Sequence, residues 1–234
     1  MSAARDMLCD TARAVFAVAD DIAPVEEAGF ALLLVPEAEG GFGGDWGDVD
    51  AVLQIAGVIV PDLPVAGLIL SDVDDGLRAA ATVSLMAGAM GQALALSIEH
   101  VNMRQQFGRP LGKFQAVQQS LAVMACEVRA VEAAAAALAA RLDAVGRDPS
   151  TADFEIAAAK LRANRAVGVV TAIAHQVHGA IGFTEEYDLH RVTIPLMRWR
   201  GEDGNDAHWA QVLGRQVAGF GGRGLWEVMT ARGA

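Results

Sequence analysis

Two stretches decide the fold: RQQFGRP at residues 104–110, followed by FQ at 114–115, and HQVHGAIGF at residues 175–183. In each of them, polar or cationic groups stand beside a glycine at the end of a long alanine-rich segment. Alanine is the best helix former, and glycine often ends a helix. Each stretch therefore predicts the end of a long helix.

The segments around these stretches have helical spacing of apolar residues. Gly146 and Pro149 are expected to close the second long helix, Gly179 the third, and Thr151 to be the N-cap of the third. Three long antiparallel helices and a shorter fourth predict an all-α fold built on a four-helix bundle. The expected helices of this region cover residues 76–106, 113–145, 151–178, 186–199 and 205–217.

The first part of the chain predicts shorter helices, at 4–20, 24–30 and 48–60, with a glycine loop at 40–44. Two runs, 31–35 and 66–70, are the best candidates for strands, and residues 61–75 are expected to form a linker or a short extended piece. The expected domains are an N-terminal helical region (1–64), a linker (65–75) and a C-terminal helical bundle (76–234).

The composition bounds the function. Hydrophobic residues make up 53% of the chain and the net charge is -11, which argues against non-specific nucleic-acid binding. Two cysteines give neither a disulfide framework nor a metal cluster, so a cytoplasmic protein is expected. The acidic N-terminus does not resemble a signal peptide, and the apolar windows at 30–35 and 51–60 are too short to span a membrane.

The two glycine stretches each allow two interpretations. The Arg104 guanidinium could pair with a pyrophosphate, or it could complement the dipole of the helix that ends there. Gly179 and Gly182 could let the backbone approach a bulky ligand near Gln176, or they could form an ordinary helix end. His178 is expected to be a buried core histidine, and the histidine spacing predicts no metal site.

Taken together, these stretches resemble the acyl-CoA dehydrogenase family. The string QVHGAIGFTEEY (176–187) is similar to the family's form, which has glycine where Ala180 stands, and EAGF (27–30), VPE (35–37) and GGFG (40–43) resemble part of the family's first helical domain. The resemblance covers residues 24–64 and 76–217 and implies that the chain contributes to binding FAD. The cofactor-binding residues that it implies are Arg104, Gln106, Phe107, Gly108, Phe114, Gln115, Gln176, Val177, Gly179, Gly182 and Asn205.

The chain departs from the family in two respects. The family has a β-domain between its helical domains, but here Pro64 and Gly76 are too close in sequence to contain one. The family's catalytic glutamate, in a Glu-Gly-Thr stretch, corresponds to Asp203, with Glu202 adjacent and expected to point elsewhere. The alternative family location for that glutamate corresponds to about Arg78. Glu202 and Asp203, followed by Asn205 and Asp206, could instead be N-cap and dipole partners of the next helix.

The resemblance implies an acyl-CoA substrate, α,β-dehydrogenation with FAD, and assembly as a dimer or tetramer, with an electron acceptor that the residues do not identify. Some family members are heteromers with one degenerate subunit, often acting on bulky thioesters such as those of steroid side chains. This chain is similar to such a shortened subunit, whose partner would be a full-length acyl-CoA dehydrogenase. A non-catalytic assembly subunit and a plain helical bundle with coincidental motifs are the alternatives.

Overall fold

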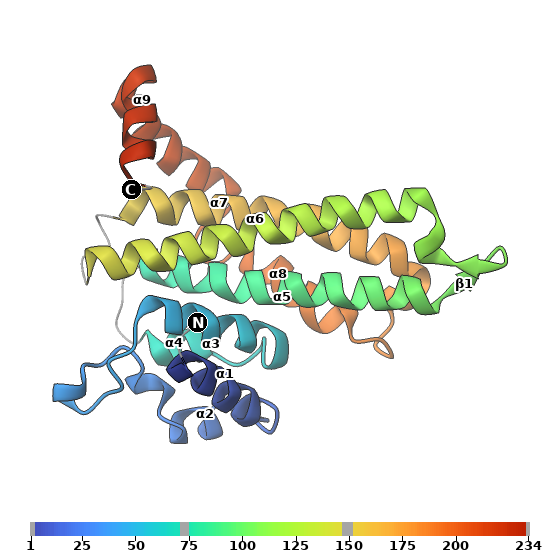
Figure 1. Cartoon of the computed structure of the whole chain (residues 1–234), viewed down its shortest axis with the longest axis horizontal. Coiled ribbons are helices and arrows are strands. Elements are labelled where there is room, and N and C mark those ends of the chain that lie inside the picture. The colour runs from blue at the N-terminus through green and yellow to red at the C-terminus, as the bar shows by residue number, and fades with distance from the viewer. Residues whose placement is uncertain (1–2, 71–74, 147–151, 233–234) are drawn as a thin grey trace.

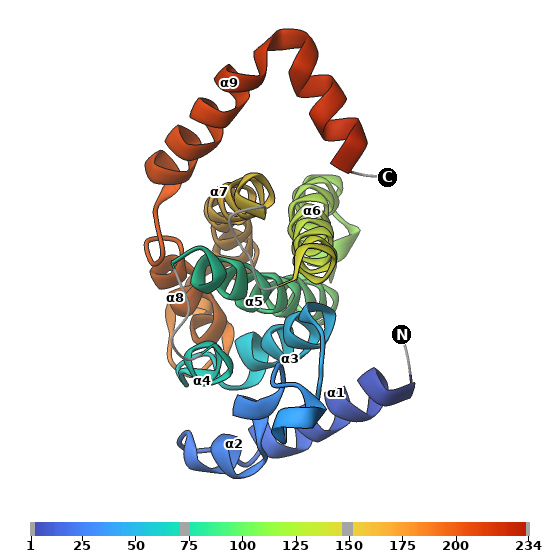
Figure 2. The same cartoon turned by 90° about the vertical axis from the view of Figure 1, so that its left-hand side faces the viewer.

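The computed structural model describes residues 3–70, 75–146 and 152–232. Three long helices, α5 (Asp75–Met103), α6 (Gln115–Val145) and α7 (Asp153–His178), lie side by side along the long axis of the molecule (Figure 1). The shorter α8 (Leu189–Trp199) completes the bundle, as the end-on view in Figure 2 shows. The predicted all-α fold and four-helix bundle are confirmed.

Helix α5 is the centre of the packing, because α3 (Trp46–Ile59), α6, α7 and α8 all contact it. The crossing with α3 is close enough to require glycine. A Cβ atom on Gly88 would lie 2.0 Å from the Gln54 carbonyl oxygen, and one on Gly57 would lie 2.3 Å from that of Leu85. Glycine at these two positions therefore lets the two backbones meet.

The N-terminal helices α1 (Ala3–Phe16) and α2 (Ala23–Glu27) lie on the side of α3 that faces away from the bundle (Figure 2). A capping box between Asp45 and Asp48 starts α3, and Arg5 of α1 donates to both carboxylates, at 2.5 and 2.6 Å. One buried apolar cluster includes Phe16, Leu53 and residues of all four bundle helices. The proposed division at residues 64 and 75 stays a prediction.

Neither of the two candidate strands is a strand in the structure, so both of these predictions are wrong. Residues 31–35 include part of the 3-10 turn η1 (Phe30–Leu32), and residues 66–70 lie largely in α4 (Val65–Ile69). Val65 and Ile69 are both buried, and their spacing of four residues places them on one helix face. A further 3-10 turn, η2 (Glu37–Glu39), precedes the glycine loop. Thr151 and Pro149, expected at the limits of helices, lie outside the described residues.

Strand pairing among the described residues occurs in a hairpin that the sequence did not predict. β1 (Gln105–Gln106) pairs antiparallel with β2 (Arg109–Pro110) directly after α5, and the 3-10 turn η3 (Leu111–Lys113) leads from it into α6. The hairpin projects from one end of the bundle (Figure 1). The hairpin therefore places the predicted cofactor-binding residues between 104 and 115 at that end of the bundle.

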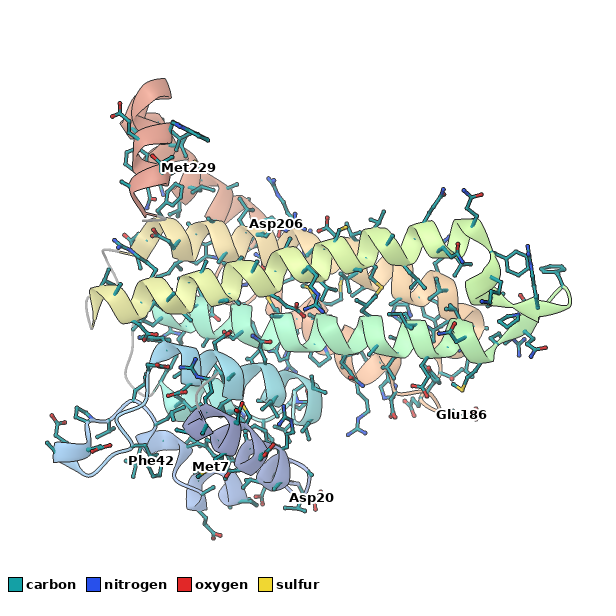
Figure 3. The ribbon with its side chains drawn as sticks, viewed as in Figure 1. Met7, Asp20, Phe42, Glu186, Asp206 and Met229 are labelled. Atoms are coloured by element: carbon teal, nitrogen blue, oxygen red, sulfur yellow. The ribbon has the colours of Figure 1, made fainter. Side chains whose placement is uncertain are left out.

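The last helix, α9 (Asp206–Arg232), is longer than the predicted 205–217. Gly221 has φ 68° and ψ 167°, which divides the helix into two arms that diverge in Figure 2. Side chains of the first arm reach the bundle, where Trp209 is buried and Phe220 lies 6.2 Å from Phe154 between ring centroids. In Figure 3, Met229 marks the second arm, away from the other helices.

Two described segments, Asp75–Met103 and Asp153–Phe183, are long and apolar enough to cross a membrane by length and composition alone. Buried residues account for 61% of the most apolar window of the first and 39% of that of the second. Core helices of a bundle have the same composition. Burial in the bundle accounts for the apolar character of most of the first window and of a smaller part of the second.

The α3–α5 crossing is testable by adding one methyl group. We expect Gly88→Ala to lower the free energy of unfolding by about 1–3 kcal/mol, because the new Cβ overlaps the Gln54 carbonyl oxygen. Gly214→Ala in α9 is the control: its Cβ meets nothing within 4 Å, so it should leave stability unchanged or raise it by about 0.5–1 kcal/mol. Chemical denaturation of both variants measures the difference. Equal stability of the two would show that the crossing is looser than described.

Candidate functional site

A cleft of about 590 Å³ lies at the hairpin end of the bundle. Arg104 and Gln106 line it from the end of α5 and the hairpin, and Gln176, Val177 and Gly179 line it from the end of α7. The antiparallel course of α5, α6 and α7 brings these segments together although they are far apart in sequence (Figure 1). Five of the predicted cofactor-binding residues therefore share one cavity wall.

The main chain at Arg104 is fixed while its side chain is exposed. The Arg104 N–H donates to the His100 carbonyl at 2.8 Å, and the Arg104 carbonyl accepts from the Leu111 N–H at 2.8 Å. Among the described residues, no ion pair or side-chain hydrogen bond involves the Arg104 guanidinium. A cation held in this way at the mouth of a cleft is suited to an anionic ligand.

Phe107 and Gly108 form the two-residue turn of the hairpin. Both have positive φ, 52° and 78°, as hairpin turns of this length often require. The Phe107 side chain is 90% exposed, and its ring lies 6.1 Å from that of Phe114, over which the Arg109 guanidinium stacks at 4.1 Å. Gln115 begins α6 and is exposed. These residues stand beside the cleft and do not line it.

The turn after α7 separates the roles of its two glycines. Gly179, with φ 64°, ends the helix and faces open space, since a Cβ atom there would meet nothing within 4 Å. Gly182 is buried in the 3-10 turn η5 (Gly179–Phe183), where a Cβ atom would lie 2.9 Å from that of His178. Gly179 is therefore open to a ligand, whereas Gly182 is a packing position.

His178 is buried, as predicted, and its Nδ1 lies 2.7 Å from the Ala174 carbonyl oxygen. Its ring stacks on His100 at 4.5 Å, a residue of the cleft that the sequence did not single out. Burial is the main cause that lowers the pKa of both histidines below the usual value. Both rings are therefore neutral at neutral pH, and Arg104 supplies the positive charge of the cleft wall.

Asp203 lies in a different place. Its Oδ2 accepts a hydrogen bond from Thr82 at 2.7 Å, and its Oδ1 lies 3.6 Å from Arg78 Nε, near the start of α5. At 1.5 Å per residue, the helix from Thr82 to Arg104 is about 33 Å long. In Figure 3, Asp206, close to Asp203 in the chain, lies far from Glu186 near the hairpin end. The candidate base and the cleft are separate within one chain.

A second pocket, of about 300 Å³, surrounds Asp203. Arg78, Thr82 and Trp199 line it, together with residues between Pro61 and Leu70. Glu202 is also among the residues around this pocket, but its carboxylate lies 3.4 Å from Arg198 Nε and makes none of the contacts of Asp203. Asn205 is in neither pocket: its side chain accepts from the His208 N–H at 3.0 Å and caps α9, which supports the capping interpretation.

Lys160 is a residue that the sequence analysis did not single out. The chain has only two lysines, Lys113 and Lys160, and Lys160 on α7 is fully buried. Its Nζ donates to Asn164 Oδ1 at 2.9 Å, to the Trp199 carbonyl at 2.8 Å and to the Glu202 carbonyl at 2.9 Å. Burial lowers the pKa of Lys160 to about 8.

No group of three or more His, Cys, Asp or Glu side chains in the described ranges is placed to hold a metal ion. The cleft offers an arginine, amides and glycines, and the second pocket offers carboxylates.

The family model described as "Acyl-CoA dehydrogenase, C-terminal domain" matches residues 77–218, which include both pockets' bundle residues and more than half of the chain. The chain belongs to the acyl-CoA dehydrogenase family. The match ends before the second arm of α9 and begins at the start of α5, so it corresponds to the bundle and the first arm.

Two curated relatives show the range of the family. The chain is 36% identical over 141 residues to the 3-sulfinopropanoyl-CoA desulfinase of Paraburkholderia xenovorans (strain LB400), covering 60% of this chain and 33% of the relative. It is 34% identical over 120 residues to acyl-CoA dehydrogenase IpdE2 of Mycobacterium tuberculosis, covering 50% and 35%. The chain thus spans about a third of the length of these relatives, and their names describe different reactions.

Two solved structures resemble the fold. Glutaryl-CoA dehydrogenase from Mycobacterium smegmatis is 27% identical with a TM-score of 0.57, covering 62% of this chain and 36% of that one. A glutaryl-coenzyme A dehydrogenase in complex with glutaryl-CoA is 16% identical with a TM-score of 0.79, covering 92% of this chain and 95% of that one. The second likeness extends the shared fold to the N-terminal helices.

The buried lysine predicts an unusual dependence of stability on pH. The folded-state pKa of Lys160 is about 8 against 10.5 for a free lysine, so the unfolded chain binds one more proton between these values. The contribution of Lys160 to stability should therefore rise with pH between about 8 and 10.5. Three nearby carboxylates, those of Asp203, Glu202 and Asp206, act against this lowering of the Lys160 pKa because they favour the charged ammonium. Two of these carboxylates also have an arginine beside them: Arg78 lies near Asp203, and Arg200 near Asp206.

We expect the melting temperature of the wild type, measured relative to Lys160→Met at each pH, to increase from pH 7 to pH 10. Using the difference between the two proteins removes the effect of every other titrating group. A difference that stays constant or shrinks over this range would mean that Lys160 is solvated.

Proposed function

We propose that this chain is a subunit of an FAD-dependent acyl-CoA dehydrogenase and that its cleft forms part of a flavin site completed by another subunit, for which a full-length family member is the best candidate. The observation that carries this proposal is the convergence of Arg104 and Gln106 with Gln176 and Gly179 on one cleft. Membership of the family supports the cofactor.

The cleft residues fit the phosphate-bearing part of a dinucleotide. Arg104 offers a guanidinium that the described residues leave without an ion pair, Gln106 and Gln176 offer amides, and the open backbone at Gly179 permits close approach. The exposed ring of Phe107 is available to a second molecule at the same end. Strand pairing in the described residues is limited to the two short strands of the hairpin, which supports a partner that supplies the sheet covering the flavin ring.

The distance between the two sites makes an oligomer necessary for catalysis. A base and a hydride acceptor must act on one substrate, yet Asp203 and the cleft lie at places about 33 Å apart along α5. A flavin bound at the cleft of one chain therefore cannot serve Asp203 of the same chain. The proposal requires that each site be completed by residues of a neighbouring subunit.

In the proposed reaction, Asp203 removes the α-proton of the acyl thioester. When bound, FAD supplies the acceptor for the β-hydride. Thr82 donates a hydrogen bond to the Asp203 carboxylate, and Arg78 lies 3.6 Å from it, so both contacts hold this side chain in the second pocket. The same contacts restrain a side chain that is one methylene shorter than glutamate, which supports the alternative of a non-catalytic assembly subunit whose partner supplies the base.

Flavin content tests the cleft. We expect little flavin absorbance from the chain alone and a full flavin spectrum after co-expression with a full-length family member. Arg104→Ala should lower the flavin retained by that complex, whereas Arg129→Ala, which removes an exposed arginine of α6 that lies outside the cleft, should not. Unchanged flavin content in Arg104→Ala, or flavin held by the partner regardless of this chain, would favour the assembly subunit.

Turnover tests the base. If Asp203 accepts the proton, Asp203→Asn should reduce the turnover number of the complex by about 10²–10⁴-fold, because the amide cannot act as a base. Flavin content should stay unchanged, since Asp203 is not part of the cleft. Full activity in Asp203→Asn would assign catalysis to the partner subunit. Rapid-reaction reduction of the flavin by an acyl-CoA is the measurement.

A further inference from the structure

The turn that carries Asp203 has an unusual conformation. Asp203 has φ 50° and Gly204 has φ 101°, so two successive residues lie in the region that most side chains avoid. A Cβ atom on Gly204 would lie 2.5 Å from Trp209 Nε1, which leaves room only for glycine. Such a conformation persists only where the surroundings hold it.

Lys160 is placed to hold it. Its ammonium donates to the Trp199 carbonyl at the end of α8 and to the Glu202 carbonyl immediately before Asp203, at 2.8 and 2.9 Å. Lys160 is buried, and these two hydrogen bonds attach both sides of the turn to α7. Carbonyls at a helix end have no intrahelical partner, and the buried ammonium satisfies that of Trp199 as well as the Glu202 carbonyl in the turn.

Two further contacts complete the support. Asn164, which accepts the third hydrogen bond of Lys160, donates to the Gly204 carbonyl at 3.2 Å. Trp209 Nε1 donates to the Asp203 carbonyl at 2.9 Å from the first arm of α9. The main chain is thereby held at Glu202, Asp203 and Gly204, and the Asp203 carboxylate faces Thr82 in the second pocket.

We propose that Lys160 is the positioning residue of the second pocket: it fixes the 199–204 turn and thereby directs the Asp203 carboxylate into the pocket. The catalytic meaning of this proposal rests on the proposed function, but the structural claim does not. If Lys160 positions the turn, removing its ammonium should change the conformation of residues 199–204. If Lys160 only fills space in the core, the turn should keep its conformation.

Isotope-labelled lysine gives the first test in the intact wild-type chain. With two lysines in the sequence, a ¹⁵Nζ spectrum contains at most two signals, and Lys113→Met, a change at an exposed position, assigns them. A hydrogen-bonded buried ammonium exchanges slowly with water and should be visible at neutral pH, with a titration midpoint near pH 8. A Lys160 signal that is lost to rapid exchange would overturn the proposal, and this result does not require Lys160→Met to fold.

The second test follows the turn in Lys160→Met, with Lys113→Met as the matched control. The proposal expects amide exchange at residues 200–204 to accelerate at least about tenfold and the Trp209 indole resonance to shift, while amides of α6 keep their protection. Lys113→Met should change neither. If Lys160→Met folds and leaves both readouts unchanged, Lys160 does not position the turn.

Activity of the co-expressed complex separates the two proposals. Where Asp203→Asn loses turnover, Lys160→Met should also lower the turnover number and shift the pH dependence of flavin reduction. Where Asp203→Asn is fully active, the proposed base is wrong, and the exchange and indole measurements alone decide the role of Lys160.

Discussion

The close packing around α5 is the constraint on which the rest of the structure depends. Five other α-helices contact α5, and at Gly88 the backbone of α3 approaches so closely that a single added carbon would overlap it. Alanine fills much of the remaining surface of α5, which keeps the neighbouring helices near. Because α5 spans the bundle, the residues at its two ends are held far apart by the length of the helix. The cleft and the Asp203 pocket are separated for this reason.

Much of the bundle could be predicted because its signals are local. The limits of α5, α6 and α7 lie within three residues of the predicted ones, since apolar spacing and terminal glycines act within one turn. The hairpin at 105–110 was missed because two-residue strands are too short to show alternation. The same ambiguity made α4 resemble a strand. The second arm of α9 was missed because clustered glycines usually end a helix, and here Gly221 only bends it.

The two sites differ in how far the sequence could define them. The cleft follows from topology: consecutive antiparallel helices of similar length bring the end of α5 and the end of α7 to the same side. The surroundings of Asp203 depend on the course of a short irregular turn, which no local pattern encodes. Lys160 was missed because a lysine in an alanine-rich helix is usually exposed. The three carbonyl and amide oxygens that make it a buried residue come from its own helix and from residues some forty positions later.

The scarcity of lysine has a practical consequence for mapping assemblies. Lys160 is enclosed, so Lys113 is the one described side chain that presents a primary amine to solvent. It follows Leu111, which lines the cleft, and precedes Phe114 at the start of α6. An amine-directed crosslinker can therefore attach to a described side chain of this protein at a single point. Each crosslink from Lys113 to another subunit would therefore limit the distance between the edge of the cleft and the crosslinked residue of that subunit.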